Sequence, residues 1–400
     1  MPSIRFYGFD NDWEQRKLGE LVDRVVRKNI NNESTLPLTI SAQYGLVDQI
    51  TYFNNRVASR DVSNYYLVLN GEFAYNKSTS DGYPFGAVKR LDLYEKGVLS
   101  TLYIVFAPKK EQQIDSDYLT VFFDTDRWHK GVAERAAEGA RNHGLLNISA
   151  EDFFDIDLSV PKDIVEQKQI GAFIRQLDNL ITLHQRKFEK LTNVKKSMLE
   201  KMFPQNGSCY PAVRFKGFTG PWERRKFGDV FEEYSEKNRA DLPPLTIIQG
   251  SGTIRRDESE RALQYDKAGL SNYKVVNEGD LIVHLRSFEG GLEKANSQGI
   301  ISPAYHTFHG EGVDSRFYYT YFRSKNFIDT DLKPHVYGIR DGRSIDIEGM
   351  KTIEIPFTSY PEQKLIGDAI DSINTLISLQ RRELEKLQSI KKSLLEKMFV

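Results

Sequence analysis

Two stretches of the chain carry the hydrophobic spacing of a long amphipathic helix. Apolar residues four and three positions apart recur in the first stretch at Ile170, Ile174, Leu177, Ile181, Phe188 and Leu191. The second stretch repeats the spacing at Ile366, Ile370, Ile373, Ile377, Leu384 and Leu387. This heptad pattern is the signature of a coiled coil, and about 38 residues of helix extend about 57 Å. Two such helices in one chain most simply pair with each other, and two-fold symmetry requires an antiparallel pair.

The two helical stretches are the ends of an internal repeat. Residues 166–203 and 362–399 align without a gap at an offset of 196, and 21 of 38 positions are identical. Residues 4–20 align with 213–229 at an offset of 209, and weaker matches in between lie at 208, 202 and 199. Because the offset falls steadily along the chain, we expect one fold present twice, with longer loops in the first copy.

The middles of the two copies have diverged, but both contain short strand-like runs between Gly, Asn, Asp and Pro residues. The runs lie at 65–69, 100–108 and 153–161 in the first copy and at 273–276, 280–285 and 351–357 in the second. Helices are expected near 114–135 and 313–327. The sequence therefore predicts an α+β fold of two similar globular α/β domains, separated by an antiparallel pair of long coiled-coil helices with pseudo-two-fold symmetry. The expected segments are a first domain at 1–160, a helix at 161–203, a linker at 204–213, a second domain at 214–356 and a helix at 357–400.

Similar ends around diverged middles allow two interpretations. In a structural interpretation the ends are core and the middles are tolerant surface. In a functional interpretation the ends perform one task twice, while the middles perform two different tasks. His184 and Gln380, which interrupt the two heptad seams, can fix the register of the helix pair or be solvated irregularities.

Composition excludes several classes of site. One cysteine forms no disulfide framework or zinc cluster, and the seven histidines show no HExxH spacing. The start lacks a signal-peptide pattern and no apolar run is long enough to span a membrane, so we expect a cytoplasmic protein. The net charge of −1 neither suggests nor forbids a nucleic-acid partner.

Catalytic motifs are also missing from the sequence. It contains no GxxxxGK[ST] phosphate loop and no Asn/Asp-Pro-Pro-aromatic element of an adenine methylase. A nuclease-like pattern can be forced from Asp163, Glu166 and Lys168, but a glutamate in the first turn of a helix has a plain helix-dipole explanation. We therefore expect no catalytic residues, no metal site and no cofactor.

Basic and polar residues on glycine-bearing loops are the candidate binding groups, since such side chains can reach phosphates and base edges. Ordinary surface charge is the alternative for each of them. The candidates for DNA binding are Lys77, Lys89, Arg90, Arg141, His143, His284, Arg286, Arg340 and Arg343. The best of these are Arg141 and Arg340, because they align in otherwise diverged surroundings.

The last turns of both predicted helices are basic. A run of this kind is usually a solvated helix face. Its near-exact duplication, however, favours a partner that binds twice. The candidates for partner binding are Lys187, Lys195, Lys196, Arg382, Lys391 and Lys392.

The duplicated chain closely resembles the specificity subunit of type I restriction–modification systems. The resemblance is carried by RFYGF…WEQRKLGEL at 5–21 and RFKGF…WERRKFGDV at 214–230, and by EQKQIG…KKSMLEKMF and EQKLIG…KKSLLEKMF at the helical ends. It implies that each variable region reads one half of a split double-stranded DNA site. It also implies that the helices dock two methyltransferase subunits, which methylate adenine at N6, and that restriction–translocase subunits join the complex. The chain itself would supply specificity and no chemistry.

Two other functions remain open at this point. One is a stand-alone DNA-binding regulator or anti-restriction protein, which would bind DNA tightly without a methylase partner. The other is a coiled-coil adaptor that joins proteins and has no role at DNA; absent or salt-insensitive DNA binding would favour it.

Overall fold

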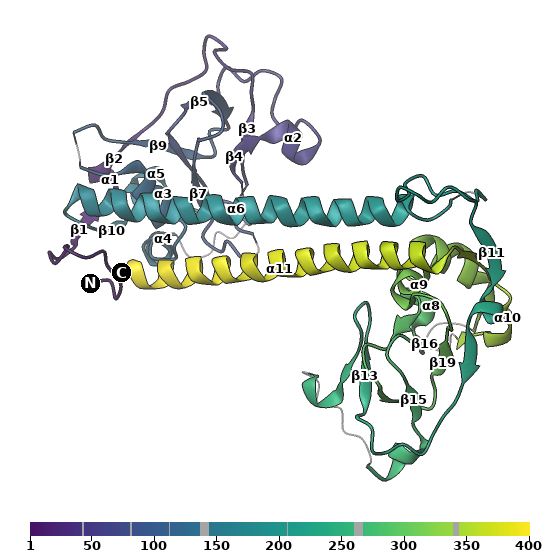
Figure 1. The fold of residues 1–400 in the computed structure, drawn as a ribbon. Helices are drawn as coiled ribbons and strands as arrows, with labels where there is room; N and C mark the ends of the chain where they lie inside the picture. The colour runs from purple at the N-terminus through teal and green to yellow at the C-terminus, as the bar shows by residue number, and fades with distance from the viewer. Residues whose placement is uncertain are drawn as a thin grey trace. The chain divides into compact units, whose positions relative to one another are not determined.

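The computed structural model describes residues 1–41, 44–80, 82–111, 113–136, 144–205, 207–259, 267–338 and 344–400. The chain divides into two compact units: unit 1 holds residues 1–185 and 382–400, and unit 2 holds residues 186–381. The two predicted long helices are present as α6 (Ile164–Lys201) and α11 (Tyr360–Met398) (Figure 1). Each unit contains part of both helices, whereas the sequence-based segments end where the helices end. No helix within the described ranges is long and apolar enough to cross a membrane.

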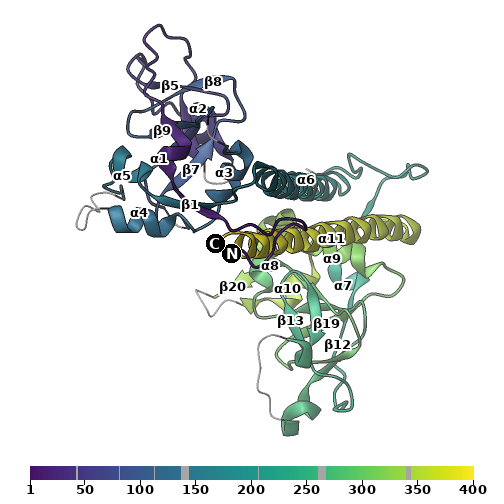
Figure 2. The same ribbon diagram turned by 90° about the vertical axis from the view of Figure 1, so that its left-hand side faces the viewer.

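The globular part of unit 1 is built on a four-stranded antiparallel sheet in the order β2-β9-β6-β7, with the two-stranded pairs β1-β10, β3-β4 and β5-β8 around it. Figure 2 shows α3 beside the strand β7 of this sheet. The elements are β1 (Glu14–Lys17), α1 (Leu18–Leu21), β2 (Val22–Arg24), β3 (Leu38–Ser41), β4 (Gly45–Asp48), α2 (Gln49–Phe53), β5 (Tyr66–Leu69), β6 (Phe73–Asn76), β7 (Ala87–Arg90), β8 (Lys96–Leu99), β9 (Ile104–Pro108), α3 (Ser116–Phe122), α4 (His129–Arg135), α5 (Ala150–Phe154) and β10 (Asp157–Val160).

Unit 2 repeats this topology with a sheet in the order β12-β19-β16-β17 and the pairs β11-β22, β13-β14 and β15-β18. It adds the short hairpin β20-β21. The elements are β11 (Glu223–Lys226), α7 (Phe227–Val230), β12 (Glu232–Tyr234), β13 (Leu245–Ile248), β14 (Gly252–Arg255), η1 (Arg256–Glu258), η2 (Lys267–Asn272), β15 (Lys274–Val276), β16 (Leu281–Val283), α8 (Ser287–Gly290), β17 (Glu293–Lys294), β18 (Gly299–Ile301), β19 (His306–His309), α9 (Ser315–Phe322), η3 (Phe327–Leu332), η4 (Lys333–His335), β20 (Val336–Tyr337), β21 (Ser344–Ile345), α10 (Ile347–Lys351) and β22 (Glu354–Phe357). The matching strand orders confirm one fold present twice.

The same polar joint fixes each globular domain to the first turn of its long helix. In unit 1, Glu166 is buried and accepts hydrogen bonds from Arg5 at 2.7 Å and from the indole of Trp13 at 3.4 Å. Because a buried carboxylate is costly unless it is paired, these partners explain why a glutamate stands at this position.

Unit 2 builds the joint from the aligned residues. Glu362 is fully buried, and it accepts from Arg214 at 2.6 Å and from Trp222 at 3.1 Å. The next residue, Gln363, accepts from the backbone N–H of Asp314 at 3.0 Å, just before α9 begins. Gln167 makes the same contact with Asp115 before α3, at 2.9 Å. The Glu-Gln pair is therefore repeated because both side chains hold the globular domain to the long helix.

The repeated Met-Phe endings of the helices are also core residues. Met398 and Phe399, at the end of α11, are 2% exposed and belong to the hydrophobic core of unit 1, where Phe399 contacts Tyr118. Met202 and Phe203, after α6, belong in the same way to the core of unit 2. The end of one long helix therefore completes the hydrophobic core of each unit.

Within each unit the two helix segments run antiparallel. In unit 1, Lys391 is 2.7 Å from Asp178, while Phe399 reaches the ring of Trp13, which bonds to Glu166 at the start of α6. Residue numbers therefore rise along α11 as they fall along α6. In unit 2, Arg381 lies over the ring of Phe188. The heptad residues on these segments are buried or partly buried, as the coiled-coil pattern predicts.

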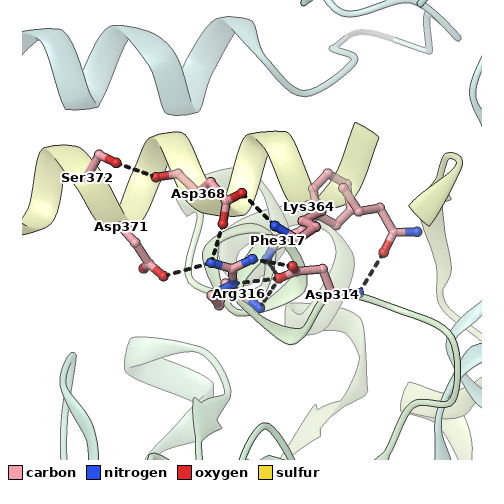
Figure 3. A network of polar contacts seen from close by, with 8 residues as sticks. Asp314, Arg316, Phe317, Lys364, Asp368, Asp371 and Ser372 are labelled. Atoms are coloured by element: carbon pink, nitrogen blue, oxygen red, sulfur yellow. Dashed lines mark hydrogen bonds and ion pairs between the residues drawn. The ribbon is translucent and has the colours of Figure 1, made fainter. Parts of the chain in front are cut away.

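A second polar contact between domain and helix has opposite charges in the two units. In unit 2, Arg316 near the start of α9 lies 2.6 Å from Asp368 and 3.4 Å from Asp371, both on α11 (Figure 3). The aligned contact in unit 1 joins Asp117 of α3 to Arg175 of α6. The geometry is retained, but the cation and the anion have changed sides.

Candidate nucleic-acid interface and docking surfaces

The loop after β6 in unit 1 carries Lys77. This loop lies beside residues 144–148. The Nζ atom of Lys77 is 3.4 Å from the carbonyl oxygen of Ile148, and its backbone carbonyl accepts from the N–H of Leu146. Thr79 bonds in turn to Gly144. These contacts bring the loop to the base of the segment that contains Arg141 and His143, two candidates that lie outside the described residues.

Lys89 and Arg90, the next candidates, lie on β7 and are held in ion pairs. Lys89 is 2.7 Å from Asp124, and Arg90 is buried and binds Asp92 at 2.7 Å and Asp117 at 2.8 Å. Burial disfavours the charge of Arg90, but these two carboxylates outweigh it and raise its pKa. Both side chains therefore stabilise the domain, and their charges are already paired within it.

The equivalent loop of unit 2 follows β16 and contains His284 and Arg286. His284 is partly buried, whereas Arg286 is exposed. The helix α8, which follows the loop, contacts β21 of the added hairpin. The two strands of this hairpin flank the segment that contains Arg340 and Arg343, which lie outside the described residues. In both units, then, a strand-end loop stands near the base of the segment that carries the aligned arginine.

The predicted partner-binding residues of the helices fall into two groups. Lys187, Lys196, Arg382 and Lys392 are exposed. Lys195 and Lys391 are partly buried, and Lys391 forms ion pairs with Asp124 at 3.3 Å and Asp178 at 2.7 Å. Lys391 would have to give up these ion pairs to meet a partner protein, whereas the exposed group would not.

Exposed leucines on both helices form an apolar surface that the lysine pattern did not reveal. Leu180 and Leu183 on α6 are 47% and 61% exposed, and the aligned Leu376 and Leu379 on α11 are 47% and 50% exposed. These residues lie off the heptad seam, and they are identical in the two copies. Leucines that are repeated at positions outside the seam were the available sequence signal.

The surfaces described so far are suited to binding. Within the described ranges, no group of three or more His, Cys, Asp or Glu side chains is arranged to hold a metal ion. The forced nuclease pattern also has another explanation, since Glu166 is buried in the joint with Arg5 and Trp13. The arrangement offers loops and helix faces for partners.

Comparison with known proteins finds similarity to one family. Residues 10–193 match the family model of the type I restriction modification DNA specificity domain. The chain is 24% identical over 410 residues to the type I restriction enzyme MjaVIII specificity subunit of Methanocaldococcus jannaschii, a match that covers 96% of this chain and 91% of that protein. The crystal structure of a type I restriction–modification system S subunit from M. genitalium is 13% identical and has the same fold, with a TM-score of 0.59 over 100% of this chain and 99% of that one.

The structure and these comparisons agree with the resemblance that the sequence carries. The matched region spans the first copy of the repeat, and the second copy has the same strand order and the same joint. The chain therefore resembles the specificity subunits of type I restriction–modification systems in sequence and in fold.

Proposed function

We propose that this chain reads a bipartite DNA sequence and that each globular domain recognises one half of it. The observation that carries the proposal is the repeat itself: the two domains share strand order and joint, but differ in the loops at their strand ends. A shared framework with different loops is the expected design for reading two different half-sites. The chain supplies sequence specificity and performs no chemistry.

The long helices, in this proposal, dock two methyltransferase subunits and set the distance between the half-sites. The exposed leucine pairs support it, because an apolar surface repeated on both helices offers the same contact twice. The exposed residues Lys187 and Lys196 follow the leucines along α6, and Arg382 and Lys392 follow them along α11, so a docked subunit would also meet positive charge. Restriction–translocase subunits join through the resulting complex.

Methylome sequencing tests the proposed function directly. Cells with the gene and a methyltransferase partner should show N6-methyladenine in both parts of one split sequence. Deleting the gene should remove the methylation from that sequence alone. An unchanged methylome, combined with tight specific DNA binding by the chain alone, would instead support a stand-alone regulator. No DNA binding at any salt concentration would support a protein adaptor.

The spacing function has its own test. Deleting seven residues from one long helix removes about 10 Å of helix, which corresponds to about three base pairs. The spacer of the methylated sequence should shorten accordingly while the half-sites stay the same. A spacer of unchanged length would contradict the role of the helices as a ruler.

A further inference from the structure

A closed cluster of four charged side chains stands in unit 1 where the globular domain meets both long helices. Asp124, which follows α3, is 2.7 Å from Lys89 and 3.3 Å from Lys391. Lys391 is also 2.7 Å from Asp178. Two lysines and two aspartates therefore balance each other, and the cluster needs no further ion.

Unit 2 has a different set of charges at the equivalent positions. Glu293 pairs with Ile282 in its sheet, and Lys89 pairs with Ala74, the residue that aligns with Ile282 at the offset of 208. The helical repeats align at an offset of 196. The equivalent residues are Glu293 for Lys89, Arg323 for Asp124, Lys195 for Lys391 and Asn374 for Asp178.

The replacement leaves positive charge in excess. Glu293 is fully buried, and it is already satisfied by Arg323, Tyr319 and the backbone N–H groups of Gly250 and Gly252. Lys195 forms no ion pair with any described residue. Burial and the charge of Arg323 lower the pKa of Lys195. The positions that hold two lysines and two aspartates in unit 1 therefore hold two cations and one carboxylate in unit 2, which favours an external anion.

His284 adds a hydrogen-bond donor to this region. Its Nδ1 atom accepts the backbone N–H of Arg286 at 3.3 Å, and burial together with Arg323 and Arg286 lowers its pKa to about 4. The ring is therefore neutral at pH 7 and carries its hydrogen on Nε2. That Nε2 atom is buried and has no hydrogen-bond partner among the described residues. A buried donor without a partner is costly, so a ligand that accepts from it would be stabilising.

We propose that Lys195, His284, Arg286 and Arg323 form an anion site that binds one backbone phosphate of DNA, and that only unit 2 has it. The inference rests on the proposed DNA-reading function. Three cations and an N–H donor suit the several oxygens of a phosphate.

The position of Arg286 favours DNA over a partner protein. Arg286 is exposed on the same strand-end loop that stands near the hairpin β20-β21, on the part of the domain proposed to face DNA. A carboxylate of a methyltransferase subunit is the other possible anion, and it is an outcome of the test.

The test measures how the affinity for DNA depends on salt. The purified full-length chain is titrated with a labelled duplex of arbitrary sequence between 50 and 200 mM NaCl, as wild type and as the double variant Lys195→Gln/Arg286→Gln. Loss of one phosphate contact should reduce the slope of log K against log[salt] by about 1 and weaken binding about tenfold at 100 mM NaCl. Lys216→Gln, which removes an exposed lysine before β11 in the same unit, should leave both values unchanged.

A neutral variant separates the histidine from the cations. His284→Phe removes the donor but no charge, so it should weaken binding about threefold at an unchanged slope. Circular dichroism and melting curves confirm that each variant is folded.

The outcomes separate the phosphate site from the proposed DNA-reading function. A wild-type slope in the double variant would overturn the phosphate site while leaving DNA reading intact. Normal DNA binding combined with lost association with the methyltransferase subunit would overturn it in favour of a protein carboxylate. A wild-type chain that binds no duplex would refute the proposed function itself.

Discussion

The two units share their joint but not the charged contacts next to it. Arg5, Trp13 and Glu166 in unit 1 have the same arrangement as Arg214, Trp222 and Glu362 in unit 2. A few residues away, Asp117–Arg175 has become Arg316–Asp371, and Lys89–Asp124 has become Glu293–Arg323.

The difference separates two kinds of constraint on a duplicated protein. The joint needs one carboxylate with a fixed set of donors, so its residue types recur. The ion pairs need only opposite charges, so either side can be the acid. Identical lysines can then have different roles: Lys391 completes a cluster in unit 1, while burial and the charge of Arg323 lower the pKa of Lys195 in unit 2. The following predictions sharpen this comparison, from the largest expected effect to the smallest.

The helix endings should be equally important in both units. Phe203→Ala and Phe399→Ala each remove a side chain that is 2–3% exposed in an aromatic core. Each should lower the free energy of unfolding of its own unit by about 4 kcal/mol. Hydrogen exchange measured by mass spectrometry assigns the loss to a unit. A loss below about 1 kcal/mol in either unit would show that its core does not depend on the helix end.

The joints should also respond alike. Glu166→Ala leaves Arg5 unpaired, and Glu362→Ala leaves Arg214 unpaired, so each should cost about 3 kcal/mol in its own unit. Glu200→Ala, which removes an exposed glutamate from α6, is the matched control and should cost less than about 0.5 kcal/mol. Clearly unequal losses from the two joints would contradict their equivalence.

The aligned lysines should differ. Lys391→Gln leaves Asp124 and Asp178 with one counterion fewer and should destabilise unit 1 by about 2 kcal/mol. Lys195→Gln relieves the repulsion from Arg323 and should change the stability of unit 2 by less than about 0.5 kcal/mol. Equal destabilisation, measured by urea unfolding, would mean that Lys195 has an acidic partner after all.

Acid should weaken unit 2 more than unit 1, because burial lowers the pKa of His129 in unit 1 but the pKa of His284 in unit 2 falls further. Burial and two arginines lower the pKa of His284 to about 4, so between the ordinary histidine value and pH 4 only the unfolded chain takes up this proton. The free energy of unfolding of unit 2 should therefore fall as the pH falls, by about 1 kcal/mol at pH 5 after allowance for partial exposure.

Asp124 affects the free energy of unfolding of unit 1 in a lower pH range. Burial opposes its ionisation, but Lys89 and Lys391 outweigh burial and lower its pKa. Its contribution is therefore present above the ordinary carboxyl range and is lost only at lower pH. Hydrogen exchange at pH 7 and pH 5 compares the two units, and His284→Gln should remove the difference. Equal acid sensitivity of both units in the wild type would argue against this assignment.

Much of the fold could be predicted from the sequence because it depends on periodic patterns. The heptad seams predicted α6 and α11, and the offset series predicted a fold repeated twice. The expected helices near 114–135 and 313–327 are present as α3, α4 and α9, and the strand-like runs contain β5, β9, β10, β15, β16 and β22. Part of the run at 153–161 is instead helical, because Phe153 and Phe154 end α5.

The candidate sites were less predictable because charge alone does not reveal partners. Lys89, Arg90 and Lys391 looked like exposed basic residues, but carboxylates distant in sequence pair with them. The leucines off the seam were repeated in the sequence, yet only the structure shows that they are 47–61% exposed. Arg141, His143, Arg340 and Arg343 lie outside the described residues, so their contact with DNA stays a prediction.

The central claim is that each recognition domain reads one half-site, and an exchange of residues 21–160 tests it most directly. The donor should be another specificity subunit with acidic residues at the positions of Asp117 and Asp124, so that Arg175 and Lys391 keep their partners. Sequencing of N6-methyladenine in cells with the exchanged chain should show one new half-site, with the other half unchanged. A change in both halves, or in neither, would contradict the account.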